Sequence, residues 1–240
     1  MNMLGERQNR WVTQSAWIKS LTASFIRSWD RRSGTSGGLF GGRSKKEGEV
    51  LGWSRAQQAA FLIFAWRKFA DAVAASKDVW AEDLRHQKIR EEKVPRLEDV
   101  KASNDLAFFG THSLITTDQG VRGFLHVVND LCYQQASMLK LNTWRPDERS
   151  SANSIAAVES SLTSFSTQNF ASFVTSIGNA LASFDWRTSS TPGLDEQERR
   201  AKLVFRGSGG YKELRMQLLE HLVSMDGDIK AVAKRLLGRL

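Results

Sequence analysis

The chain has 240 residues, of which 41% are hydrophobic, and it contains eight Trp, thirteen Phe and one cysteine. A globule of this length buries roughly 70–75% of the surface that its unfolded chain exposes, so the apolar core needs no covalent or metal support. The single cysteine, Cys132, excludes an internal disulfide framework and indicates a reducing compartment, for which we predict the cytoplasm. No apolar run approaches the roughly 20 residues that span a membrane, and no signal peptide is evident, so we expect no membrane partner.

The formal net charge is +8, and the basic excess lies at the two ends of the chain. Residues 1–53 carry nine Lys and Arg against four Asp and Glu, and residues 194–240 carry ten against seven. The residues between these segments are balanced. Such an imbalance favours an anionic partner, most often nucleic acid, although ordinary solubilising charge would produce the same pattern.

The N-terminal part is predicted as a basic helix over residues 1–33, with its apolar side chains mostly on one side. Residues 34–52 contain many glycines and predict a flexible loop. Within that loop, residues 37–44 match the form G-x-x-x-x-G-R-S. We reject a nucleotide-binding loop here because that motif needs a preceding strand, and a helix precedes it.

Residues 53–75 predict a second helix, with Ser54 as its N-cap. Residues 59–66 are apolar all round, which indicates burial on more than one side or contact with a partner. Residues 78–93 have fewer apolar positions among charges and predict a solvent-exposed helix that ends before Pro95.

Residues 116–141 predict the central helix of the molecule, about six turns long. Its apolar residues recur at steps of three, four and seven: Val121, Phe124, Leu125, Val128, Leu131, Cys132, Met138 and Leu139. Thr116 or Thr117 can cap its first amides, and Gly120 and Gly123 allow another backbone or a ligand to approach closely. His126 falls off the apolar stripe and is predicted as a surface or interface residue.

Further helices are marked by apolar residues from Ile155 to Phe165, from Phe170 to Phe184 and from Leu214 to Leu222, and by a segment from Asp195 to Phe205. A last helix holds Ile229 to Leu240 on one face. The beginning of the last helix resembles the first helix of a helix-turn-helix, but no recognition helix can follow it. The sequence therefore predicts an all-α fold: one bundle of about seven to nine helices around the helix near 118–141. Residues 53–240 form the helical domain.

A glycine-rich turn before residue 211 is the best candidate for an anion site. Free amides, small residues and the helix dipole would all attract an anion there. The alternative is an ordinary turn between helices with Ser208 as N-cap. The candidate nucleic-acid contacts are the residues of this turn and three cations of the glycine-rich loop: Arg206, Ser208, Gly209, Gly210 and Lys212, with Arg43, Lys45 and Lys46.

Three separated stretches together resemble a known family. They are the aromatic helix leading to Asp78-Val79-Trp80, the segment ITTDQGVRGFLHVVNDL at residues 115–131, and the turn RGSGGYKEL at residues 206–214. In this order they resemble the helical C-terminal part of the DGQHR-domain proteins, a group that includes DndB-like accessory proteins of DNA sulfur modification. The likeness covers about residues 10–225. The Asp-Gly-Gln-His-Arg motif and the αβ domain around it are absent, so the resemblance carries over no catalytic residue.

The resemblance implies an accessory role in bacterial DNA modification or phage defence. It also implies a partner chain that supplies the missing αβ half. We therefore expect a non-enzymatic helical module that docks on nucleic acid, with DNA the favoured type, or on that partner.

Two alternatives remain open. Arg215 and His221 match the R-x(4–6)-H spacing of HEPN-type ribonucleases, in which a histidine acts as acid or base and an arginine steadies the phosphate. The chain could instead be a structural subunit, with residues 61–66 as its contact surface. The four histidines show no metal-ligand spacing, and we expect no metal and no cofactor.

Overall fold

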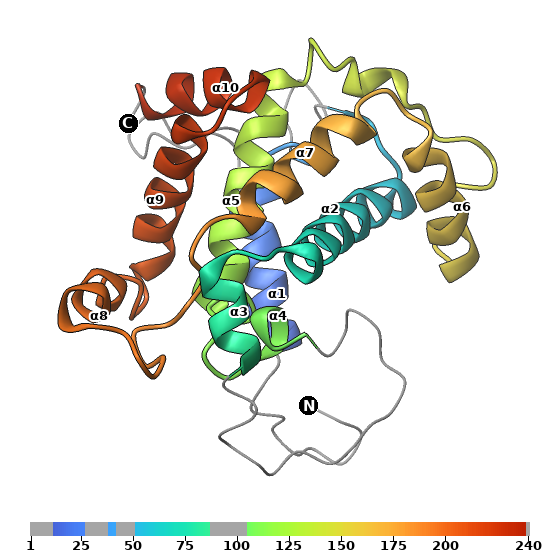
Figure 1. The fold of residues 1–240 in the computed structure, drawn as a ribbon. Helices are drawn as coiled ribbons and strands as arrows, with labels where there is room; N and C mark the ends of the chain where they lie inside the picture. The colour runs from blue at the N-terminus through green and yellow to red at the C-terminus, as the bar shows by residue number, and fades with distance from the viewer. Residues whose placement is uncertain (1–11, 27–37, 42–50, 87–104, 239–240) are drawn as a thin grey trace, which may run out of the picture.

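The computed structural model of the chain describes residues 12–26, 38–41, 51–86 and 105–238. Within these ranges the chain forms ten α-helices and no β-strand, which confirms the predicted all-α fold class (Figure 1). Nine of these helices are eight residues or longer. An isolated bridge between Ser113 and Arg187 is the nearest approach to sheet structure in the described part.

Helix α5 (Asp118–Gln135) is the buried centre of the molecule. The Thr117 hydroxyl accepts a hydrogen bond from the Gly120 amide (3.1 Å), as the capping prediction required. A Cβ on Gly120 would clash with the carbonyl oxygen of Leu114, and one on Gly123 would lie 2.8 Å from the Leu214 side chain. Both glycines are therefore needed because neighbouring parts of this chain pack against the first turns of α5.

The central helix is shorter than the sequence pattern predicted. It ends at Gln135, and the Leu141 amide donates back to the Ala136 carbonyl (3.0 Å) while Lys140 adopts a left-handed conformation (φ 52°). Met138, which was placed on the apolar stripe, lies in this turn and is 78% exposed. The prediction carried the helix past Gln135 because the residues of the turn keep the apolar spacing of the helix although the helix has ended.

Helix α2 (Arg55–Ala75) begins with the expected Ser54 cap, which forms a capping box with Gln57. Helices α6 (Ile155–Ser166) and α7 (Ala171–Ala182) both pack against it. Phe61, Phe64 and Ala65 are buried there, and the other residues of 61–66 are half-buried. The predicted subunit contact surface at residues 61–66 is therefore part of the core.

Helix α1 (Gln14–Leu21) and the π-helical turn η1 (Thr22–Ile26) lie along α5. Residues 38–41 of the predicted glycine-rich loop pack against them. Leu39 and Phe40 are buried, and the Leu39 amide donates to the Asn129 side-chain oxygen (3.0 Å). The candidate contacts Arg43, Lys45 and Lys46 lie outside the described residues, as do parts of the predicted N-terminal helix.

Helix α3 (Val79–His86) is less exposed than predicted, since Trp80 and Leu84 are buried. Arg85 fixes this helix to the end of α2 by donating to the carbonyl oxygens of Val73 and Ser76 (2.6 Å each). It also pairs with Asp105 at the start of the short helix α4 (Leu106–Phe109), which raises the pKa of Arg85. Residues 87–104, which include the rest of the predicted helix, lie outside the described part.

The C-terminal helices lie on the side of α5 away from α6 (Figure 1). Helix α8 (Glu196–Leu203) leads through a glycine turn to α9 (Gly210–Ser224), and α10 (Asp228–Leu237) follows after a second turn. α9 packs along α5, and α10 contacts both of them. This arrangement places the glycine turn beside the first turns of α5.

Candidate functional site

The segment from Arg206 to Lys212, called here the glycine turn, joins α8 to α9. Gly207 has φ +78°, a conformation that other residues rarely adopt, and Gly209 is the N-cap of α9 without a side-chain cap. The segment does join two helices, as the alternative had it, but Ser208 is not the N-cap, because α9 begins at Gly210. Two amides are already used: Gly210 N–H donates to the Gly207 carbonyl (3.2 Å) and Lys212 N–H to the Gly209 carbonyl (2.9 Å).

The candidate contacts in the glycine turn differ in their access to solvent. Arg206, Ser208, Gly209 and Lys212 are exposed, whereas Gly210 is buried against the backbone of Phe205. Neither cation forms an ion pair with a residue in the described ranges. Both charges are therefore available to an external anion.

One carboxylate lies close in sequence to these cations. Glu213 is exposed in the first turn of α9, where its Oε1 accepts a hydrogen bond from Gln217 Nε2 (3.0 Å). Its charge reduces the positive potential of the glycine turn but leaves a net excess of one cation over the segment.

The glycine turn is held to α5 by polar and aromatic contacts. Gln119 Nε2 donates to the Gly207 carbonyl (3.1 Å). The Tyr211 ring stacks on the His126 ring with centroids 5.4 Å apart, and the guanidinium carbon of Arg122 lies 5.3 Å from the centroid of Tyr211. These contacts fix the direction in which α9 starts.

Four polar residues on α5 form a row, called here the α5 polar row: Asp118, Arg122, His126 and Asp130. Their four-residue spacing places them on one side of the helix. The last three of them contact residues of α9. Arg215 Nε of α9 donates to Asp130 Oδ2 at 2.6 Å, and both side chains are almost completely buried. Asn129 Nδ2 donates to the other oxygen of Asp130 (3.3 Å).

His126, predicted as a surface or interface residue, is only 7% exposed and lies between α5 and α9. Burial, together with the nearby charges of Arg215 and Arg122, lowers its pKa to about 4, so it is neutral at physiological pH. The regular spacing of the α5 polar row was the sequence signal for this interface. The sequence alone did not show what this row contacts, because Tyr211 and Arg215 are about ninety residues away along the chain.

The two candidate ribonuclease residues contact different parts of the fold. Arg215 is held by Asp130, whereas His221 Nε2 lies 2.9 Å from the Ser183 hydroxyl, just after α7. Six positions on a helix correspond to a rise of about 9 Å and a rotation of about 120° between the two side chains. Each of the two side chains is therefore held by a different neighbour.

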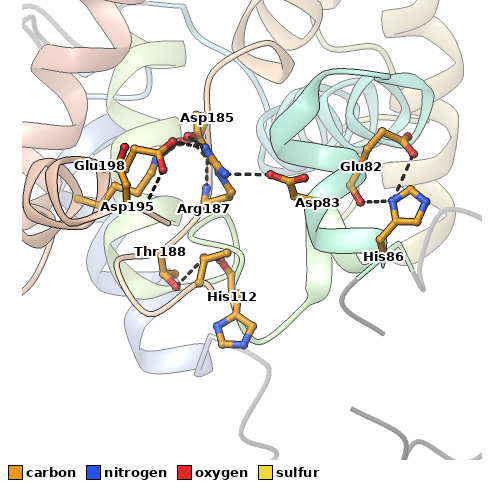
Figure 2. Close-up of polar contacts among 11 residues, drawn as sticks. Glu82, Asp83, His86, His112, Asp185, Arg187, Thr188, Asp195 and Glu198 are labelled. Carbon is orange, nitrogen blue, oxygen red and sulfur yellow. Dashed lines mark hydrogen bonds and ion pairs between the residues drawn. The ribbon is translucent and has the colours of Figure 1, made fainter. Parts of the chain in front are cut away.

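A second charged cluster holds α8 in place (Figure 2). Arg187 pairs with Asp83 of α3 (2.9 Å), with Asp185 (2.8 Å) and with Glu198 of α8 (3.1 Å). Burial alone would raise the pKa of Asp185, but Arg187 and Lys202 outweigh it and the pKa is lowered. The cluster links α3 to α8, and its basic and acidic side chains pair with one another. We therefore interpret it as structural.

The part of the chain that the structure describes offers no metal site and no membrane span. It contains no group of three or more His, Cys, Asp or Glu side chains that could hold a metal ion. None of its helices is both long enough and apolar enough to cross a membrane. No family model matches the sequence, and it matches neither a curated protein nor a solved structure.

Proposed function

We propose that this chain is a non-enzymatic helical module that docks on nucleic acid through the glycine turn. The observation that supports this function best is the pair Arg206 and Lys212, both exposed and without an ion pair among the described residues. They flank five residues, of which three are glycines. Little side-chain bulk therefore separates a bound phosphate from the backbone.

The position of the turn also suits docking. The contact between Gln119 and Gly207 and the stacking of Tyr211 on His126 hold it against α5. A contact surface held in one conformation loses less entropy on binding than a free loop does. The cations would position the nucleic acid without reading its sequence.

The charge distribution indicates that the glycine turn does not act alone. The described residues carry twenty Lys and Arg against eighteen Asp and Glu, so most of the net charge of +8 belongs to the other segments. Arg43, Lys45 and Lys46 belong to one of these segments, and we propose them as further phosphate contacts.

The biological setting that we propose rests on the resemblance to the DGQHR-domain proteins. An accessory role in bacterial DNA modification or phage defence would fit a chain that binds DNA without altering it. A partner chain carrying the αβ domain would then supply the enzymatic half, and this chain would bring it to the DNA.

Binding of a 20-base-pair duplex DNA, measured by fluorescence anisotropy over a range of salt concentrations, tests the proposal. Each lost phosphate contact lowers the slope of log K against log salt by about 0.9, so Arg206→Gln with Lys212→Gln should reduce it by about 2. The matched control is Lys77→Gln with Arg149→Gln, two exposed cations outside the C-terminal helices.

The proposal fails if the wild-type chain binds duplex DNA without salt dependence, or if both double variants have the same slope. The ribonuclease alternative has a separate test. It requires cleavage of RNA in the presence of EDTA and loss of that cleavage in His221→Ala.

A further inference from the structure

Helices α9 and α10 form a pair joined by a short turn, and this pair resembles a helix-turn-helix motif. Helix α9 ends at Ser224, three residues form a turn, and α10 begins at Asp228. Gly227 in this turn has φ +90°. Figure 1 shows α10 lying across the end of α9. The sequence suggested that α10 resembles the first helix of a helix-turn-helix, whereas the structure makes it the second helix of a pair joined by a short glycine-containing turn.

The two faces of α10 have different chemistry. Ile229, Val232, Ala233 and Leu236 are buried, and α10 packs on α9 and α5. The exposed residues on the other side are three cations and two small residues: Lys230, Lys234 and Arg235, with Ala231 and Gly238. The successive 100° rotation of a helix places Lys230 and Arg235 at the edges of this face, and Ala231, Lys234 and Gly238 nearer its centre.

Two acidic residues lie near the start of this face. Asp228 is in the first turn of α10, where a negative charge suits the helix dipole. Asp226 lies 3.7 Å from Lys230, but both side chains are well exposed, and such pairs hold their partners weakly. The remaining exposed positions of α10 carry no acid, and within the described ranges neither Lys234 nor Arg235 forms an ion pair.

We propose that α10 docks in the major groove of duplex DNA. This inference rests on the proposed function and names its partner. An α-helix with its side chains is about 10–12 Å wide, and the major groove of B-form DNA is about 12 Å wide. Small residues near the centre of the face let the helix enter, while the cations reach the phosphates along the groove.

This surface and the glycine turn lie at opposite ends of α9. The helix has 15 residues and is therefore about 22 Å long. No side chain belongs to both places, so substitutions in one leave the other unchanged. The contribution of α10 can therefore be measured separately from that of Arg206 and Lys212.

The test uses the full chain and two 20-base-pair duplexes of the same sequence, one of DNA and one of RNA. Lys234→Gln with Arg235→Gln should lower the salt slope for DNA by about 2. The major groove of duplex RNA is too deep and narrow to admit a helix. Binding of the RNA duplex should therefore change less than twofold in the same variant. The Lys77→Gln and Arg149→Gln variant is the control for lost charge.

Each outcome separates this inference from the proposed function. If DNA binding weakens in the Arg206 and Lys212 variant but not in the α10 variant, the glycine turn is the site and the α10 inference is wrong. Equal losses on DNA and RNA would show a contact with phosphates alone, which also overturns groove docking. A wild-type chain that binds no duplex contradicts both proposals. The melting temperature of each variant shows that it is folded.

Discussion

Breaking the buried pair between Arg215 and Asp130 should cost more stability than any other single charge substitution in the described residues. Their side chains are 7% and 1% exposed, and the joining hydrogen bond is 2.6 Å long. Removing one member leaves the other charge buried without its partner, which typically costs about 3–5 kcal/mol. We therefore expect Arg215→Met and Asp130→Asn each to lower the free energy of unfolding by about that amount.

The assay is urea unfolding followed by tryptophan fluorescence, for which the chain offers eight Trp. The double variant should lose much less than the sum of the two single losses, because neither charge is then left buried alone. Arg200→Gln, which breaks an exposed pair with Glu196 (side chains 74% and 68% exposed), should change little. Additive losses, or single losses no larger than that of Arg200→Gln, would refute the reasoning.

Two further predictions concern the same helix. The pKa of His126 is about 4 in the folded chain, below the value of 6.5 in the unfolded chain. The contribution of His126 to the free energy of unfolding is therefore present above pH 6.5 and is lost as the pH falls toward 4. Between pH 7.5 and pH 5 the loss of stability from His126 amounts to about 2 kcal/mol. In urea titrations, His126→Gln should remove this pH dependence. The same pH dependence in the wild type and the variant would contradict the prediction. Gly120→Ala should lower the melting temperature strongly because its Cβ would clash with the Leu114 carbonyl, whereas Gly209→Ala, whose Cβ meets nothing within 4 Å, should not. Equal melting temperatures for these two variants would show that the close approach to Leu114 is unimportant.

Local features were predictable because their causes lie within a few residues. Ser54 and Thr117 cap their helices as expected, since a hydroxyl before an apolar-periodic segment reaches amides three residues on. The apolar repeat in α5 also identified the central helix, because a stripe this wide must be covered by other helices.

Other features depended on residues that are distant in the chain. The apolar composition of residues 61–66 fits a core and a contact surface equally well, and the packing of α6 and α7 against α2 decides for the core. His126 is polar and lies off the apolar stripe, yet Tyr211 and Arg215 cover it. The spacing of Arg215 and His221 matched a motif, but each side chain contacts a different neighbour.

The sequence by itself determined that this is an all-α protein, where most of its helices begin, and which one is central. Propensity, capping and apolar spacing act over one or two turns, so they are encoded locally. Only the tertiary structure decided which polar residues are buried, which glycines are required for packing, and which cations remain exposed. Those properties belong to pairs of helices, and the side chain that covers a residue can come from any part of the chain.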